Sequence, residues 1–186
     1  MLEIIIQGRG GQGAQTAGNL LAAAFFAAGR EVQCFASYGG ARRGTPVSSF
    51  LRVDDEPVRV RCDIERADAI LCFDASLLGP ALLACADDKT LIVVNSAQTR
   101  ADLARSLPGR QVIPVDGLEI SRRHGLGRIV NSALLGALAR GIGAPSLPVL
   151  ETTLTERSPK LHDENIAACE AGWQVADALL REQVLR

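Results

Sequence analysis

A short apolar run followed at once by a glycine-rich turn constrains this chain more than any other feature. Residues 2–6 are apolar apart from Glu3, which fits a buried parallel strand. The turn that follows consists of Gly8, Arg9, Gly10, Gly11, Gln12 and Gly13. An alanine-rich stretch from Ala14 to Ala28 comes next and predicts a helix with Gly29 as its C-cap. This order of strand, glycine turn and helix is typical of dinucleotide-binding α/β folds.

Each glycine in such a turn has its own use. Gly8 lets the backbone turn tightly, Gly10 lets it approach a ligand, and Gly13 lets the following helix lie close to the sheet. The free N–H groups at the start of that helix favour a phosphate or a carboxylate, as does the positive end of its dipole. We therefore expect an anion site here, and the alternative is a turn that serves only the packing of strand against helix.

The second apolar run lacks the acidic residue that an ordinary NAD site requires. This run extends from Val32 to Ala36 and ends in Ser37 and Tyr38. Dinucleotide folds usually place Asp or Glu at this point to hold the ribose hydroxyls. The sequence therefore favours an anion site of another kind over an NAD site.

Length and composition predict one domain that spans residues 1–186. With 47% hydrophobic residues the chain can bury one good core, and its net charge of −1 favours neither nucleic acid nor an anionic membrane as a partner. No apolar stretch approaches the ~20 residues that a membrane span needs, and no signal peptide is recognisable. We expect a cytoplasmic protein.

The cysteines show no metal-ligand spacing. They are odd in number and are never two residues apart, and they stand at Cys34, Cys62, Cys72, Cys85 and Cys169. Several lie in apolar runs, where cysteine packs as a small hydrophobic residue. We therefore expect no metal on this chain, and any iron–sulfur cluster that it serves would be held by another chain.

The remaining pattern predicts a three-layer, Rossmann-like α/β fold with a mostly parallel sheet. Strands at 47–53 and 58–61, joined by a turn at 54–57, are expected to form an antiparallel hairpin insertion. Further buried strands are predicted at 69–73, 91–94 and 111–115, with a helix at 76–86 between the first two. Helical spacing of apolar residues from position 120 onward predicts a helical C-terminus.

No set of catalytic residues emerges from the sequence. His124 and His162 stand in polar surroundings and are interpreted as surface or capping residues, and no serine lies in a G-x-S-x-G elbow. Asp74 follows a predicted strand at the edge where α/β sheets bind ligands, although it could equally be a helix N-cap. The chain therefore has the features of one part of an enzyme.

Several segments together resemble the gamma subunit of the pyruvate:ferredoxin (2-oxoacid:acceptor) oxidoreductase family. They are residues 8–14, 37–47, 50–52 and 131–136, together with Asn165. The resemblance covers nearly the whole chain. Indolepyruvate and aryl-glyoxylate oxidoreductases have similar subunits, so it leaves the 2-oxoacid open.

The resemblance implies a place in a larger enzyme. Such enzymes decarboxylate a 2-oxoacid oxidatively with thiamine diphosphate and Mg²⁺, pass electrons through [4Fe-4S] clusters to ferredoxin, and transfer the acyl group to coenzyme A. This chain has no G-D-G motif and no cluster cysteines, which implies that those cofactors lie on alpha, beta and delta chains. The isolated chain would be inactive, and it could form a homodimer.

By position, the resemblance assigns the glycine loop and a basic loop to cofactor binding. The residues are Gly8, Arg9, Gly10, Gly11, Gln12, Gly13, Arg42 and Arg43. This basic, glycine-rich rim could meet an anionic substrate or the phosphates of coenzyme A. Two other hypotheses remain open: a free-standing Rossmann-type dehydrogenase or redox sensor, and a structural interaction module in which the glycine loop serves packing alone.

Overall fold

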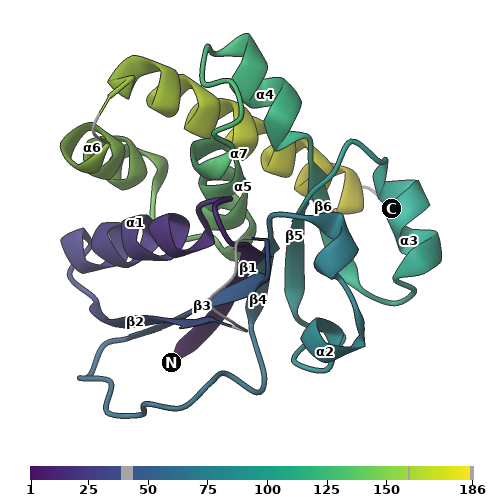
Figure 1. Ribbon diagram of the computed structural model, residues 1–186, viewed down its shortest axis with the longest axis horizontal. Helices are drawn as coiled ribbons and strands as arrows, with labels where there is room; N and C mark the ends of the chain where they lie inside the picture. The colour runs from purple at the N-terminus through teal and green to yellow at the C-terminus, as the bar shows by residue number, and fades with distance from the viewer. Residues whose placement is uncertain (39–43, 159, 185–186) are drawn as a thin grey trace.

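A six-stranded mixed sheet forms the centre of the structure, a computed structural model that describes residues 1–38, 44–158 and 160–184 (Figure 1). The strand order is β2-β3-β1-β4-β5-β6. The strands are β1 (Leu2–Arg9), β2 (Glu31–Tyr38), β3 (Pro46–Asp54), β4 (Ala69–Cys72), β5 (Leu91–Asn95) and β6 (Gln111–Val115). Strands β1, β4, β5 and β6 are parallel, and β3 is antiparallel to both β1 and β2.

Helices cover both faces of the sheet, so the predicted three layers are confirmed. One face carries α1 (Ala14–Ala27), α5 (Asn131–Ile142), α6 (Leu147–Arg157) and α7 (His162–Val184). The other carries the 3-10 turn η1 (Ala75–Leu77), α2 (Pro80–Leu83) and α3 (Arg100–Ser106), and α4 (Gly117–Arg123) precedes α5 in the chain. Side chains alternate between the two cores: Ile4 and Ile6 join the first, and Ile5 the second. Within the described ranges, no helix has both the length and the apolar character needed to cross a membrane.

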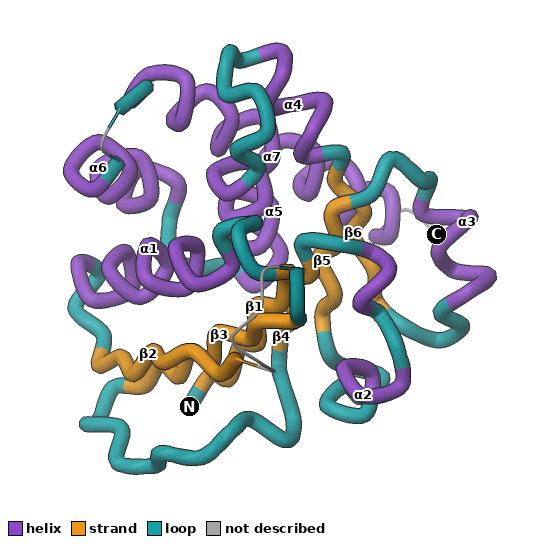
Figure 2. The backbone as a smooth tube through the Cα atoms, viewed as in Figure 1, coloured by secondary structure: helices purple, strands orange, loops and turns teal. Residues whose placement is uncertain are grey.

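An antiparallel pair is present, but the predicted pairing of residues 47–53 with residues 58–61 is wrong. Strand β3 pairs with β2, with Val32 opposite Val53 and Tyr38 opposite Val47, whereas residues 58–61 form no strand. The reason is that β3 lies between β2 and β1, so both of its edges are already paired. Residues 55–68 instead form a long connection from β3 to β4 (Figure 2).

A buried arginine fixes this connection to the sheet. Arg52 is 2% exposed, and its Nε lies 2.7 Å from Glu3 Oε1 on the neighbouring strand β1. Its Nη1 donates to the carbonyl of Cys62 at 2.8 Å, and its Nη2 donates to that of Asp63 at 3.3 Å. Buried charges need such partners, so Arg52 ties an irregular segment to a regular strand.

The predicted helix at 76–86 is much shorter in the structure, where η1 and α2 replace it. Gly79 interrupts it with an extended conformation (φ −99°, ψ 177°) ahead of Pro80. A residue before proline is disfavoured in the α region, which explains the break.

Helices α5 and α7 cross at a contact between their backbones. A Cβ atom on Gly136 of α5 would overlap the carbonyl of Cys169, and one on Gly172 of α7 would overlap the carbonyl of Ala133. Only glycine permits this approach at either position. The crossing fixes α5, whose N-terminus reaches the functional edge of the sheet.

We expect Gly136→Ala to lower the free energy of unfolding by about 3 kcal/mol, because the new methyl group must push α5 and α7 apart. Gly79→Ala is the matched control, since a Cβ there meets nothing within 4 Å and the φ of Gly79 is negative. Denaturant unfolding followed by circular dichroism measures both. Equal stability of the two variants would contradict the tight crossing.

Candidate functional site

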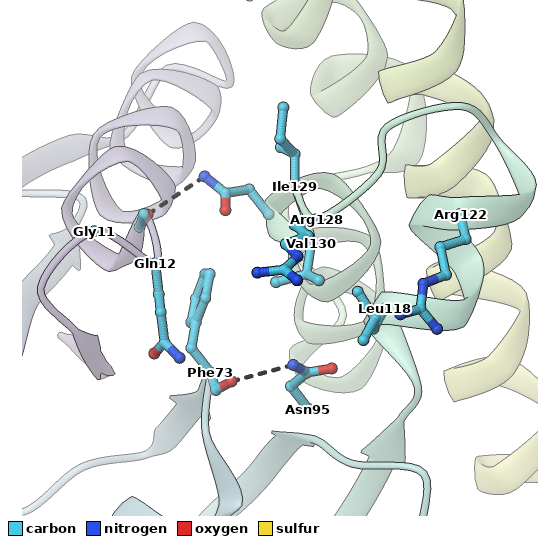
Figure 3. A pocket seen from close by; sticks show the side chains of 11 residues that line it. Gly11, Gln12, Phe73, Asn95, Leu118, Arg122, Arg128, Ile129 and Val130 are labelled. Atoms are coloured by element: carbon cyan, nitrogen blue, oxygen red, sulfur yellow. Dashed lines mark hydrogen bonds between the residues drawn. The ribbon is translucent and has the colours of Figure 1, made fainter. Parts of the chain in front are cut away.

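A cleft of about 630 Å³ opens at the edge of the sheet where β1, β4 and β5 end (Figure 3). The chain leaves β1 toward β2 on one side and returns to β4 on the other side of β1. In α/β sheets, ligands bind at the carboxyl edge beside such a change of direction. The glycine loop, residues 8–13, forms one wall of this cleft, and α4 with the residues before α5 forms the opposite wall.

The glycine loop is a closed turn with a left-handed backbone at two positions. Gly11 has φ +93° and Gly13 has φ +92°, values that residues with a Cβ atom rarely adopt. The N–H of Arg9 donates to Gln12 Oε1 at 2.7 Å, and the N–H of Gln12 donates to the Arg9 carbonyl at 2.9 Å. A Cβ on Gly11 would meet nothing within 4 Å, so its backbone is open to a ligand.

The close approach of α1 to the sheet occurs at Gly18, whereas the sequence analysis assigned that role to Gly13. A Cβ atom on Gly18 would overlap the side chain of Ser49 on β3. Gly13 instead packs against Asn131, whose Nδ2 would lie 2.7 Å from a Cβ at position 13. The expected glycine contact exists, but it lies five residues later in the chain than predicted.

Two helix N-termini meet at the cleft through this contact between Gly13 and Asn131. Gly13 precedes α1, and Asn131 is the first residue of α5, is 8% exposed and donates from Nδ2 to the Gly13 carbonyl at 3.4 Å. Neither helix has an acidic residue in its first turn. The positive ends of both helix dipoles therefore act on the same space, which favours an anion.

Arg9 holds the glycine loop to its neighbours. Its Nε lies 2.7 Å from Asp74 Oδ2, its Nη2 donates to Ser76 Oγ at 2.8 Å, and its Nη1 donates to the Gly44 carbonyl at 3.3 Å. Asp74 also accepts from the Ser76 N–H and so caps η1, as one of its two predicted roles required. Hydrogen bonds from Ser76, and then the Arg9 guanidinium, hold the pKa of Asp74 below its ordinary value.

Asn95 joins the ends of two strands to the start of α4. Its Nδ2 donates to the Phe73 carbonyl at 3.1 Å after β4 (Figure 3). Its Oδ1 accepts from the Gly117 N–H at 3.0 Å. Both polar ends of the amide are thus used in positioning α4. This fixes the opposite wall of the cleft relative to the sheet.

In the part of the chain that the structure describes, two cationic side chains and no carboxylate line the cleft. Arg122 on α4 and Arg128 ahead of α5 line it and are exposed, and neither forms an ion pair within the described ranges. Arg123, by contrast, lies outside the lining and pairs with Glu119 at 2.8 Å. Among the residues that the structure describes, no group of three or more His, Cys, Asp or Glu side chains could hold a metal ion. The arrangement suits a polyanionic organic ligand.

One wall of this cleft was predicted from the sequence pattern, and the opposite wall was not. Gly11, Gln12 and Gly13 line the cleft, Gly8 and Arg9 support it from β1, and the Gly10 N–H donates to the Thr45 carbonyl at 2.9 Å. Arg42 and Arg43 lie outside the described residues. The missed residues are Asn95, Arg122, Arg128 and Asn131. Asn95 had a readable signal, because it follows a buried strand at the same edge as Asp74. Asn131 stands in a segment that carries the family resemblance, but no role was assigned to it.

The strand order separates this site from that of an ordinary dinucleotide fold. The acid that binds ribose normally stands on the strand beside β1. Here β3 occupies that place and displaces β2 by one position, and β2 ends at Tyr38, whose hydroxyl donates to Gln15. The inserted strand β3 therefore accounts for the lack of a ribose-binding acid at the end of β2, because β2 does not lie beside β1.

We expect Asp74→Asn to lower the free energy of unfolding by about 1 kcal/mol at pH 7, because it removes a partly exposed ion pair with Arg9. The folded pKa of Asp74 is depressed, so its contribution is present above the ordinary value of about 3.9 and is lost as pH falls through the lower folded pKa. The difference in the free energy of unfolding between wild type and variant should therefore shrink as pH falls below about 3.9. An unchanged gap from pH 7 to pH 3 would refute this, and Asp88→Asn, at an exposed aspartate, is the control.

Comparisons with known proteins agree on one family. The family described as pyruvate ferredoxin/flavodoxin oxidoreductase matches residues 3–175. The pyruvate/ketoisovalerate oxidoreductases common subunit gamma of Thermococcus kodakarensis is 37% identical over 93% of this chain and 96% of its own length. The crystal structure of the pyruvate oxidoreductase subunit PORC of Thermotoga maritima superposes with a TM-score of 0.82 at 31% identity, covering 93% of this chain and 95% of that one.

The fold also recurs within a longer chain. A 2-oxoglutarate:ferredoxin oxidoreductase of Magnetococcus marinus, solved with 2-oxoglutarate, coenzyme A and succinyl-CoA, matches 95% of this chain and 31% of its own, with a TM-score of 0.76. At 22% identity this likeness shows the fold alone. The family match and the relatives of higher identity show that the chain belongs to the pyruvate ferredoxin/flavodoxin oxidoreductase family and is similar to its gamma subunits over nearly its whole length.

Proposed function

We propose that the chain is the gamma subunit of a multi-subunit 2-oxoacid oxidoreductase, inactive by itself. The assembled enzyme would decarboxylate a 2-oxoacid such as pyruvate oxidatively, yield an acyl-CoA and CO₂, and pass electrons to ferredoxin. The observation that carries the proposal is similarity to gamma subunits along 93% of the chain. Indolepyruvate and aryl-glyoxylate are alternative substrates within the same family.

In this proposal the cofactors of decarboxylation and electron transfer belong to partner chains. Alpha, beta and delta subunits would hold thiamine diphosphate, Mg²⁺ and [4Fe-4S] clusters. The proposal retains a cytoplasmic location, which suits the free thiols of Cys34, Cys62, Cys72, Cys85 and Cys169. Strand β2 forms one edge of the sheet and offers backbone groups to a further strand, so a homodimer of the isolated chain is also part of the proposal.

Within the assembly, we propose that this chain binds the phosphates of coenzyme A. The chemistry of the cleft supports this ligand: an open glycine loop, two helix N-termini and two cations without a facing carboxylate. Coenzyme A is also a ligand of the Magnetococcus enzyme that shares the fold. When bound, coenzyme A supplies the thiol that accepts the acyl group.

The residues of the chain divide into those that bind and those that position. Backbone N–H groups of Gly11 and Gly13 would donate to phosphate oxygens, and Arg122 and Arg128 would neutralise their charge. Gln12 closes the loop instead, because its N–H donates to the Arg9 carbonyl. Arg9 is a positioning residue, because its guanidinium is already occupied by Asp74, Ser76 and Gly44. Arg42 and Arg43, which lie outside the described residues, remain proposed binding residues.

The subunit assignment predicts that native partners purify with the chain. Tagged in its native cell under anaerobic conditions, it should bring down chains that carry thiamine diphosphate and iron–sulfur clusters. The eluate should reduce a viologen dye in a reaction that depends on both a 2-oxoacid and coenzyme A, and a panel of 2-oxoacids should identify the substrate. A chain that elutes alone and binds NAD(H) or FAD would support the free-standing dehydrogenase instead.

If coenzyme A binds in the cleft, the double variant Arg122→Gln and Arg128→Gln should bind it about tenfold more weakly. The reason is that each substitution removes a charge-assisted contact to phosphate. Calorimetry on the purified chain at fixed salt measures the effect. Arg123→Gln, at the neighbouring arginine that pairs with Glu119, is the matched control and should leave the affinity unchanged. Unchanged affinity in the double variant would favour a glycine loop that serves packing alone.

A further inference from the structure

A separate cavity of about 290 Å³ lies on the opposite face of the sheet from α1 and α5. It is lined by β1 and β3, by the connection at 55–68 and by α2, and the connection and α2 both lie on this side of the sheet in Figure 2. Among the described residues, none lines both this cavity and the cleft. Small-molecule sites measure roughly 300–1,000 Å³, so a cavity of this size suits a single long side chain.

The cavity contains a buried amide oxygen without a partner. Oε1 of Gln7 on β1 is shielded from solvent and accepts no hydrogen bond from any residue in the described ranges. Buried polar atoms of folded proteins are nearly always hydrogen-bonded, so an unpaired one needs an explanation. A donor that enters the cavity from another molecule would satisfy this oxygen.

Two carboxylates give this cavity a negative charge. Asp63 and Glu65 line it and are exposed, and neither forms an ion pair within residues 1–38, 44–158 and 160–184. No Lys, Arg or His of the same ranges lines the cavity. Cys85 also lines it, and burial, followed by the charges of Glu65 and Asp63, raises the pKa of its thiol. The cavity therefore favours a cation.

The segment that carries both carboxylates is fixed to the rest of the structure. Arg52 donates to the Asp63 carbonyl at 3.3 Å. The N–H of Ala67 donates to the Cys85 carbonyl at 2.8 Å. Ile64, which stands between the two acids in the chain, is 2% exposed and packs in the second core. Because this segment is held before a partner binds, little conformational entropy is lost on binding.

We propose that this cavity receives a lysine side chain from a partner subunit, a proposal that rests on the function proposed above. An ammonium group has three N–H donors and no acceptor. The carboxylates of Asp63 and Glu65, together with Gln7 Oε1, supply the acceptors that it needs. The four-carbon stem of lysine packs against the apolar side chains of Ile5 and Phe50.

Apolar surface around the cavity extends to the edge of the sheet, which favours a protein as the source of the cation. Phe50 lines the cavity and packs against Phe35, with 5.3 Å between the ring centroids. Phe35 belongs to the edge strand β2 and is half-buried. A partner chain that covers these rings gains from their burial, whereas a free amine would leave them exposed.

Zero-length cross-linking of the native complex tests the contact. The complex is purified anaerobically through a tag on this chain and treated with a carbodiimide, which joins a carboxylate to an amine that touches it. Mass spectrometry should find Asp63 or Glu65 joined to a lysine of a partner subunit. This chain has lysine only at Lys89 and Lys160, so a link to a second copy is recognised directly. Such a link, or none at either acid, would overturn the proposal.

The double variant Asp63→Asn and Glu65→Gln measures how much the contact contributes. It keeps the size of both side chains and removes their charge. Its dissociation constant for the partner subunits, measured by native mass spectrometry of the complex on dilution, should rise about tenfold. The difference from wild type should shrink as salt is added. Asp88→Asn combined with Glu182→Gln, at exposed carboxylates outside the cavity, is the matched control and should leave the constant unchanged.

The outcomes separate the lysine contact from the subunit assignment. An unchanged dissociation constant in the Asp63 and Glu65 variant would overturn the lysine contact while leaving the assignment intact. An equal rise in the control would also overturn it, because the effect would then come from overall charge. A wild-type chain that purifies without partners would overturn the subunit assignment itself.

Discussion

The contact between Gly13 and Asn131 is the constraint on which the candidate site depends. It joins the N-terminal strand–loop–helix unit to the helical C-terminal half, and it brings the first turns of α1 and α5 to one point. A side chain at position 13 would collide with Asn131 and would require a strained backbone. The crossing of α5 with α7 at Gly136 then holds α5 at this position. Close contacts at Gly13 and Gly136 thus position the two helix N-termini that form the candidate anion site.

The inserted strand β3 changes what a glycine loop of this kind can recognise. In a dinucleotide fold the neighbouring strand supplies an acid for the ribose, but here that neighbour is an antiparallel strand with both edges paired. The choice of ligand must therefore be determined by the opposite wall of the cleft, where Arg122, Arg128 and the first turn of α5 lie. This explains how a familiar loop can belong to a chain that, in our proposal, binds the phosphates of coenzyme A and not a dinucleotide.

Sequence patterns predicted those helices and strands whose signals come from residues adjacent in the chain. The run at 2–6, the glycine turn and the continuous apolar strands identified β1, α1, β4, β5 and β6, because burial on both faces leaves a local signature. Pairing was harder to predict: residues 58–61 alternate like a strand, yet no free edge of β3 remains for them. Arg122, Arg128 and Asn131 were missed for a related reason, since only tertiary packing brings them opposite the glycine loop.

The most direct test of the central claim is a titration of the ¹⁵N-labelled chain with coenzyme A, followed by amide chemical shifts. The account predicts the largest shifts at the N–H groups of Gly11, Gln12, Gly13 and Asn131, which lie at the two converging helix N-termini. Inorganic pyrophosphate should shift the same amides by smaller amounts. Saturable shifts confined to other regions, or no shifts at millimolar ligand, would contradict the account.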